Sequence, residues 1–171
     1  MAQALCNKLT KNTSAATNEP QHAILNVPIT VSAPIGKMES RHKVMGILPT
    51  TQGGRDALSV ITPIAYNPLN YYSLHKIKIE TGRTHQIRVH MSDVSKCPLV
   101  GDDMYDNQLV RTGRSKGVSK WSKRGVRRCM LHAAEVKVPH PRTGEMVCVT
   151  CPPPPEFESL ARNIRAASAQ P

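Results

Sequence analysis

A chain of 171 residues with one Phe, one Trp, four Tyr and 14 prolines must build a mainly aliphatic core with many loops, which argues against a helical bundle. Its 23 Lys+Arg against 12 Asp+Glu give a net charge of +11, and so basic a domain indicates a polyanionic partner, most often nucleic acid. The sequence contains no apolar run of about 18 residues, so neither a transmembrane helix nor a membrane partner is expected.

The first half of the chain predicts one helix followed by several strands. Residues 2–11 have Ala, Leu and Cys spaced for a short amphipathic helix. A strand is expected from Ala23 to Val31 with an interruption at Pro28, and Pro34-Ile35-Gly36-Lys37 predicts a turn. The apolar and β-branched pattern predicts further strands at 42–48, 57–64 and 72–79.

The second half predicts helices at its two ends and strand-like segments between them. A helix is expected over 84–93, after the Thr81-Gly82 turn and with Thr84 as its cap. An apolar stretch at 129–138, a turn at 140–145 and a strand at 146–150 precede a closing helix at 156–167. Strands and helices mix without a regular βαβ rhythm, which predicts an α+β fold with a largely antiparallel sheet.

Residues 107–128 form a basic stretch without a single acidic residue. Three glycines predict that it is a flexible insertion, and Trp121, the only tryptophan, lies in its middle. Such a run can be only a solvated face, but glycines and one aromatic also suit a phosphate backbone with a stacking contact. The candidate RNA-binding side chains here are Arg111, Arg114, Lys116, Lys120, Trp121, Lys123, Arg124, Arg127 and Arg128.

The five cysteines, odd in number and irregular in spacing, fit reduced thiols inside a cell better than a disulfide framework. Cys148 and Cys151 form one CxxC pair, but no second ligand pair lies at a zinc-like distance, so no metal site is expected. The N-terminus lacks the apolar core of a secretory signal. The sequence therefore indicates an intracellular protein, with cytoplasm and organelle both open.

The stretch IETGRTHQIRVHMSDVSKCPLVGDDMYD, residues 79–106, places two arginines and two histidines directly after a Thr-Gly turn and follows them with a Gly-Asp-Asp step. TGRTHQIRVH followed by PLVGD closely resembles the signature of the RluA-type RNA pseudouridine synthases. The resemblance continues, in the family's order, through PIGK (34–37), GRDALSVITPI (54–64), LHAAEV (131–136), HPRTGE (140–145) and PPPPEFESL (152–160). A single TGR motif would be weak evidence for the resemblance, but this ordered set of motifs is specific to the family.

The resemblance implies a catalytic domain built on a mixed, mostly antiparallel sheet with a central RNA cleft. It implies conversion of uridine in RNA to pseudouridine, without cofactor or metal, on a nucleotide flipped out of its stack. In this family an aspartate acts at the sugar, the uracil detaches, turns and rejoins through carbon, and a tyrosine packs against the base.

The resemblance also assigns roles to residues of the TGR motif. Arg83 matches the arginine that pairs with the catalytic aspartate, which is physically reasonable because a buried carboxylate needs a cation to stay ionised. Gln86 and Arg88, with Thr84, are expected to orient Arg83 or to touch the RNA backbone. His85 and His90 are expected to be packing histidines, and Asp102 matches a structural Gly-Asp step.

The family pattern breaks at the nucleophile. The His-Arg-Leu-Asp motif that should carry the aspartate does not occur in the chain. Residues 2–9 resemble the helix that follows the aspartate loop, so Met1 is expected just downstream of the missing residue. Gln21 falls where the family's tyrosine belongs.

Three interpretations stay open. Residues 1–167 are an N-terminally incomplete catalytic domain of a pseudouridine synthase, with the basic insertion at 107–128, or they are an inactive RNA-binding relative that acts as a ribosome-associated or assembly protein. The third is a basic α+β domain whose motifs serve only the scaffold. The RNA, whether ribosomal or transfer RNA, is not specified by the sequence, and activity of this chain alone is not expected.

Overall fold

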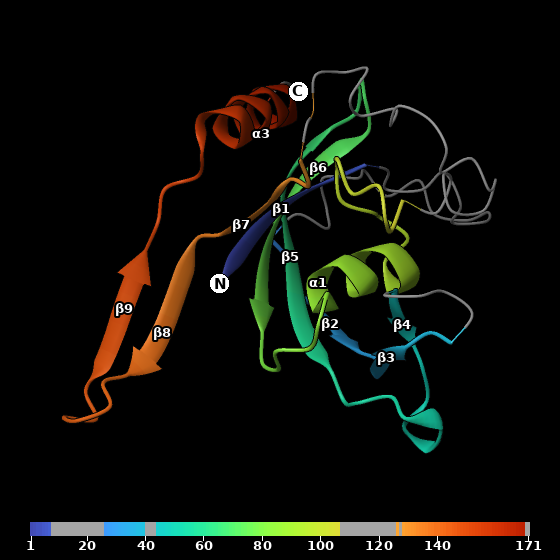
Figure 1. The fold of residues 1–171 in the computed structure, drawn as a ribbon. Coiled ribbons are helices and arrows are strands. Elements are labelled where there is room, and N and C mark those ends of the chain that lie inside the picture. The colour runs from blue at the N-terminus through green and yellow to red at the C-terminus, as the bar shows by residue number, and fades with distance from the viewer. Residues whose placement is uncertain (8–25, 40–43, 107–125, 127, 170–171) are drawn as a thin grey trace.

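The computed structural model describes residues 1–7, 26–39, 44–106, 126 and 128–169. Its centre is a five-stranded sheet with the strand order β2-β5-β6-β1-β7 (Figure 1). These strands are β1 (Ala2–Asn7), β2 (Ile29–Ser32), β5 (Leu58–Asn67), β6 (Tyr72–Ile79) and β7 (Leu131–Ala133). Two separate hairpins pair β3 (Ile35–Lys37) with β4 (Met45–Ile47) and β8 (Glu135–Pro139) with β9 (Met146–Thr150).

Four helical segments complete the described part of the chain. They are the 3-10 turn η2 (Thr50–Gln52), the short helix α1 (Gln86–Val89), the π-helical turn η3 (His90–Val94) and the helix α3 (Pro155–Ser168). Every strand pair among the described residues is antiparallel. The predicted α+β fold with a mostly antiparallel sheet is thereby confirmed. No helix in these ranges is long and apolar enough to cross a membrane.

The two faces of the sheet are buried by different segments. Helix α3 packs on β5 and β6, where Phe157, Ala161 and Ile164, spaced for one helical face, contact a cluster that includes Leu5 and Leu74. On the other face, residues from η3 and the loop after it pack with alternate residues of β1 and β6; this cluster includes Ala4, Cys6, Ile77, Met91, Cys97 and Leu99. The central strands are therefore buried on both sides.

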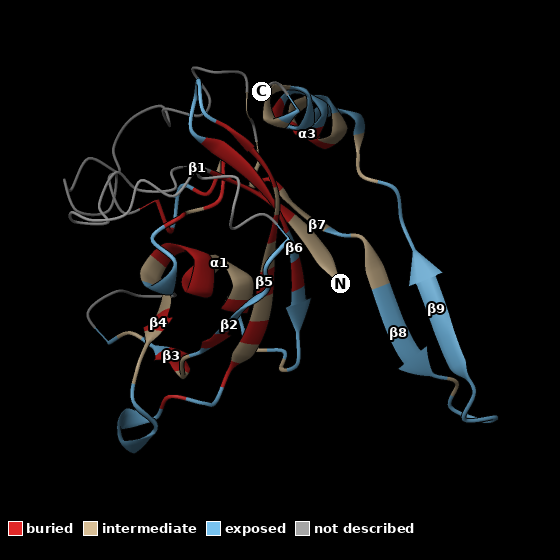
Figure 2. Ribbon diagram, turned by 180° about the vertical axis from the view of Figure 1, so that it is seen from behind, coloured by how far each residue is buried: buried red, intermediate tan, exposed pale blue. Residues whose placement is uncertain are grey.

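The β8–β9 hairpin extends away from this body and is largely exposed (Figures 1 and 2). Its exposed apolar side chains include Val136, Val138, Met146 and Val149. Cys148 also lies on this hairpin and is exposed, as is Cys151 directly after it.

The structure corrects the predicted helix at 2–11. Residues 2–7 form β1, which lies between β6 and β7. Because both faces of this strand are covered, Ala4, Leu5 and Cys6 are all buried, and the alternation that marks a half-exposed strand is missing. A run of small apolar residues then resembles a helical face.

Other boundaries differ less. The strands predicted at 72–79 and 146–150 are confirmed by β6 and β9, and the closing helix is confirmed as α3. The predicted turn at 34–37 is wrong, since residues 35–37 form β3. Thr84 is not the cap of the helix after the TGR turn: His85 occupies the N-cap position, with a left-handed φ of 57°.

Candidate functional site

The Thr81-Gly82-Arg83 turn is fastened to the start of β5 by the buried side chain of Gln86. The Gln86 amide oxygen accepts hydrogen bonds from the Thr81 hydroxyl at 2.8 Å and from the Arg83 backbone N–H at 3.0 Å. Its nitrogen donates to the Leu58 carbonyl at 2.9 Å and to the Ser59 hydroxyl at 3.0 Å. Thr81 in turn accepts the Leu58 backbone N–H at 3.0 Å. This network explains why the motif needs both a threonine and a glutamine.

Arg83 lies half-buried at the edge of this network. Its Nε donates to the backbone carbonyl of Asp56 at 2.9 Å. No carboxylate among the described residues forms an ion pair with it. A guanidinium held in this way presents a fixed fork of donors that suits a carboxylate or a phosphate.

Arg88 points instead to the Gly-Asp step. Its Nε and Nη2 donate to the two carboxylate oxygens of Asp102 at 2.8 and 2.7 Å, and its guanidinium carbon lies 4.7 Å from the centre of the Tyr105 ring. Asp102 is fully buried and also accepts the backbone N–H groups of Met104 and Tyr105. The hydrogen bonds to Asp102 raise the pKa of Arg88 above its usual value. The carboxylate of Asp102 thus holds a turn together, as its match to a structural step implies.

Both histidines of the motif are packed within the protein. His90 is fully buried, with Nε2 donating to the Ala33 carbonyl at 3.0 Å and Nδ1 lying 3.0 Å from the Ser59 hydroxyl. His85 is half-buried, with Nδ1 2.8 Å from the Tyr105 hydroxyl and its ring edge-on to the tyrosine. Burial lowers the pKa of both imidazoles, which favours their neutral forms. The expectation of packing histidines is confirmed.

Gly101 positions the segment that follows the basic stretch. It has a φ of 77°, and a Cβ atom at this position would lie 2.1 Å from the Arg128 carbonyl oxygen. Because Gly101 has no Cβ atom, the backbone at Arg128 can pass close to the Gly-Asp turn. The Met130 backbone N–H then donates to the Val100 carbonyl at 2.8 Å. The side chain of Arg128 forms an ion pair with α3, in which its Nε donates to a carboxylate oxygen of Glu156 at 2.9 Å.

The residues predicted around the TGR motif form two networks: Arg83 is held by Gln86, and Arg88 is paired with Asp102. Gln86 and Arg88 lie within these networks as supports with protein partners. Most of the predicted RNA-binding side chains lie outside the described residues: Arg111, Arg114, Lys116, Lys120, Trp121, Lys123, Arg124 and Arg127.

The sequence prediction did not include a group of side chains inside the core. The possible ligand atoms of Cys6, His75 and Cys97 lie within 4.8 Å of one another, and all three residues are buried. The CxxC pair of Cys148 and Cys151 is exposed instead. Only the alternation along β6, which predicts that His75 faces the same side as Ser73 and Ile77, carried any signal for this group.

The TGR network lies in a segment of the chain that matches a known protein family. The sequence profile of the family described as RNA pseudouridylate synthase matches residues 4–93, more than half of the chain. The chain belongs to this family. The resemblance to RluA-type pseudouridine synthases is thus confirmed, and the TGR turn and its supports up to His90 fall within the matched segment.

Curated pseudouridine synthases align with most of this chain. An uncharacterized RNA pseudouridine synthase of Synechocystis is 34% identical over 136 residues, which cover 80% of this chain and 37% of the relative. Ribosomal large subunit pseudouridine synthase D of Haemophilus influenzae is 34% identical over 137 residues, covering 80% of this chain and 40% of the relative. The chain therefore spans less than half the length of these relatives.

Solved pseudouridylate synthase domains share the fold. Human RNA pseudouridylate synthase domain containing 1 superposes with a TM-score of 0.61 at 24% identity, over 99% of this chain and 65% of that chain. Human RNA pseudouridylate synthase domain containing 4 gives a TM-score of 0.60 at 18% identity, over 96% and 61%.

Proposed function

We propose that this chain forms part of an RNA pseudouridine synthase and supplies the arginine that organises its active site. In the reaction the bond from uracil N1 to the ribose C1′ breaks, a bond from C5 to C1′ forms, the hydrogen on C5 leaves as a proton, and N1 takes up a proton. Neither a redox change nor a group transfer is involved, so the proposed reaction needs no cofactor.

The observation that carries this proposal is the setting of Arg83. Its backbone is fixed by Gln86, its Nε is anchored on the Asp56 carbonyl, and its guanidinium has no carboxylate partner among the described residues. In the proposed enzyme the remaining guanidinium donors hold the catalytic aspartate ionised and oriented at the sugar. The His-Arg-Leu-Asp motif is absent from the 171 residues, so that aspartate comes from a segment outside this chain.

RNA, whether ribosomal or transfer RNA, is the proposed partner, inside the cell. The net charge of +11 supports a polyanionic partner, and eight of the basic residues lie in the acid-free stretch 107–128. Within the proposal this stretch binds phosphate groups and Trp121 stacks on a base, while Gln86 positions Arg83. Phosphate contacts of this kind provide affinity but not sequence specificity.

The test is the release of tritium from RNA that carries uridine labelled at C5, since formation of the new C–C bond expels that hydrogen. The 171-residue chain alone is expected to release none above a control without protein. A longer native form that carries the His-Arg-Leu-Asp segment is expected to release tritium, and its Arg83→Ala variant is expected to lose that activity. Release by the 171-residue chain itself would contradict the assignment, and Asp102 and Asp103 would then be the first candidates for the nucleophile.

The second candidate is an RNA-binding relative without catalysis, acting on ribosomes or in their assembly. Gln21 at the position of the family's tyrosine and the basic stretch 107–128 favour it. Mass spectrometry of the protein from its own cells separates the two candidates. Peptides from an upstream segment with the aspartate motif support the enzyme, whereas a native protein that begins at Met1 supports the binding protein.

A further inference from the structure

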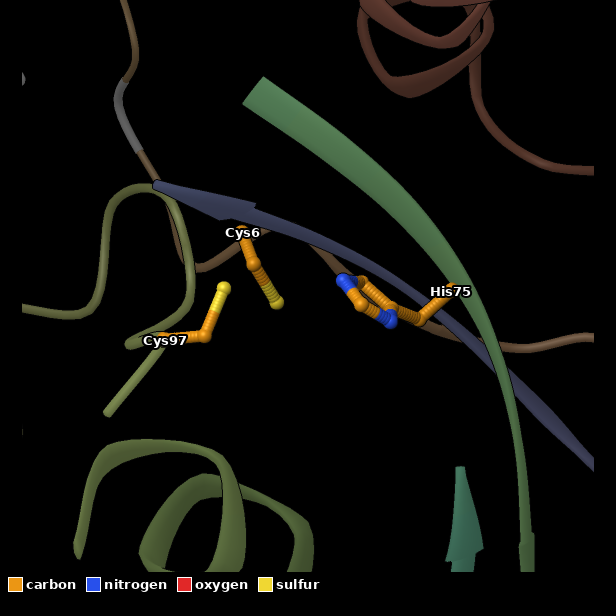
Figure 3. Close-up of side chains that lie close together, drawn as sticks. All are labelled: Cys6, His75 and Cys97. Atoms are coloured by element: carbon orange, nitrogen blue, oxygen red, sulfur yellow. The ribbon is translucent and has the colours of Figure 1, made fainter. Parts of the chain in front are cut away.

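Three potential metal ligands meet in the core between the sheet and the loop after η3 (Figure 3). Cys6 lies on β1 and His75 on the neighbouring strand β6, and the antiparallel register places Cys6 opposite Ser73 and Ala4 opposite His75. Alternate residues of a strand face the same side, so Ser73 and His75 share the face toward Cys97. An isolated bridge between Cys6 and Leu99 brings the Cys97 loop onto the edge of β1.

The distances suit a metal ion after a small contraction. The ligand atoms of Cys6, His75 and Cys97 all lie within 4.8 Å of one another. Around a tetrahedral zinc, with Zn–S of about 2.3 Å and Zn–N of about 2.0 Å, ligand atoms are separated by roughly 3.5–3.8 Å. Side-chain movements of about 1 Å are enough to close this difference.

The burial of the cluster favours a neutral complex. Cys6 is fully buried, and His75 and Cys97 are exposed by only 5% and 4%. Two thiolates and one neutral imidazole around a divalent cation carry no net charge, so such a complex avoids the cost of an isolated charge in the core. Both sulfur and imidazole ligands are preferred by zinc and by other thiophilic ions.

The Ser73 hydroxyl lies among the side chains of the cluster. His75 Nε2 lies 2.8 Å from the Ser73 hydroxyl, but Nδ1 of the same ring is buried and has no hydrogen-bond partner among the described residues. The Ser73 oxygen also lies 3.8 Å from the Cys97 sulfur. It therefore stands beside the three ligands, where it can hold a metal-bound water or complete the coordination.

We propose that Cys6, His75 and Cys97 bind one thiophilic metal ion of the Zn²⁺ class, which staples β1 and β6 to the loop after η3. The site is structural, because its ligands are closed off from solvent and lie outside the Arg83 network. Binding releases the protons of the two thiols and leaves the ion bound to two sulfurs and one ring nitrogen. Such a metal site cross-links segments that are up to about 90 residues apart in the chain. Bringing segments this far apart together without a cross-link costs chain entropy.

The test uses the 171-residue chain with Cys148→Ser and Cys151→Ser, because the exposed CxxC pair binds metal ions by itself. This parent is titrated with Zn²⁺ against a chromophoric chelator, and with Co²⁺ to detect thiolate-to-metal charge-transfer absorption. One equivalent is expected to bind, with the absorption of a tetrahedral site that has thiolate ligands. The expected cost of Cys6→Ser, His75→Asn or Cys97→Ser is at least about tenfold in affinity.

Cys129→Ser is the matched control, since Cys129 packs against the same cluster but lies 3.9 Å from Asp102 and outside the ligand group. It is expected to bind Zn²⁺ as the parent does. A second measurement needs no cluster variant: Zn²⁺ should raise the thermal midpoint of the parent, and a chelator should reverse the rise. Absence of both uptake and stabilisation in the parent would overturn the proposal, as would undiminished uptake in a folded Cys6→Ser, Cys97→Ser double variant.

Discussion

The side-chain oxygen of Gln86, the first residue of α1, accepts the backbone N–H of Arg83 in the preceding turn at 3.0 Å. Through its nitrogen the same amide binds Leu58 and Ser59 at the start of β5. The buried Gln86 thus fixes the main chain of Arg83, while the Asp56 carbonyl accepts a hydrogen bond from its Nε. Small errors in the position of a catalytic group are costly, and a buried amide is a rigid way to avoid them.

Replacing Gln86 with Leu should lower the free energy of unfolding by about 1–3 kcal/mol, because the Leu58 carbonyl and the Arg83 N–H lose a buried partner. Chemical denaturation measures this change. Gln52→Leu, at an exposed position of η2, is the matched control and should change stability by no more than about 0.5 kcal/mol. Equal losses in the two variants would show that the buried amide has no special role.

Asp102→Ala should cost about 3–5 kcal/mol, because it leaves the partly buried guanidinium of Arg88 without its partner. The Lys78–Glu80 pair is the control: its side chains are 65% and 43% exposed, against 21% and 0% for Arg88 and Asp102. Glu80→Ala should cost no more than about 1 kcal/mol. A double-mutant cycle with Arg88→Ala then isolates the coupling, and a cycle energy near zero would refute the bridge as a stabilising element.

The strands of this fold were predictable where apolar and polar residues alternate with a clear two-residue period, as over 72–79. At β1 the prediction failed because a central strand is covered on both sides, so Ala4, Leu5 and Cys6 lack the polar neighbours that reveal a two-residue period. The TGR residues were found because they adjoin in sequence. The group of Cys6, His75 and Cys97 was not, since its members meet only through strand pairing and a loop.

Gly101→Ala should destabilise the fold far more than Gly144→Ala. Both glycines have a left-handed φ, 77° and 74°, so the backbone strain of a side chain is matched. At Gly144 nothing lies within 4 Å of an added Cβ, whereas at Gly101 the Arg128 carbonyl oxygen lies at 2.1 Å. Gly144→Ala should cost about 1 kcal/mol and Gly101→Ala several times as much. Thermal unfolding of the two variants tests this, and similar midpoints would refute the close crossing.

Acidification should destabilise the protein through His90 and His85. Burial lowers the pKa of both histidines in the fold, so the unfolded chain takes up protons first as the pH falls below about 6.5. The free energy of unfolding is therefore not reduced by these histidines above that pH, and it declines below it. His90→Gln, which can still donate to Ala33, should lose less stability than the wild type between about pH 7.5 and about pH 5.5. An unchanged slope in His90→Gln would contradict the assignment.

The proposed RNA contact of the basic stretch predicts a specific salt dependence. Replacing five of its residues with Ala should weaken binding of single-stranded RNA and reduce the slope of log affinity against log salt by about 0.7 for each phosphate that the variant no longer neutralises. These residues are Lys116, Lys120, Lys123, Arg124 and Arg127; Arg128 is left unchanged because its guanidinium is bound to Glu156. A charge-matched control replaces five exposed lysines elsewhere: Lys37, Lys76, Lys78, Lys96 and Lys137.

Both variants lack the same number of positive charges, so a general electrostatic attraction would weaken RNA binding equally in the two. Direct binding of phosphate by the basic stretch predicts instead that the first variant has both a lower affinity and a smaller slope, whereas the control keeps most of its slope. Fluorescence anisotropy over a salt series measures both quantities. Equal slopes in the two variants would mean that RNA is attracted by net charge alone, and the Arg83 region would then remain the only candidate for a defined RNA-binding site.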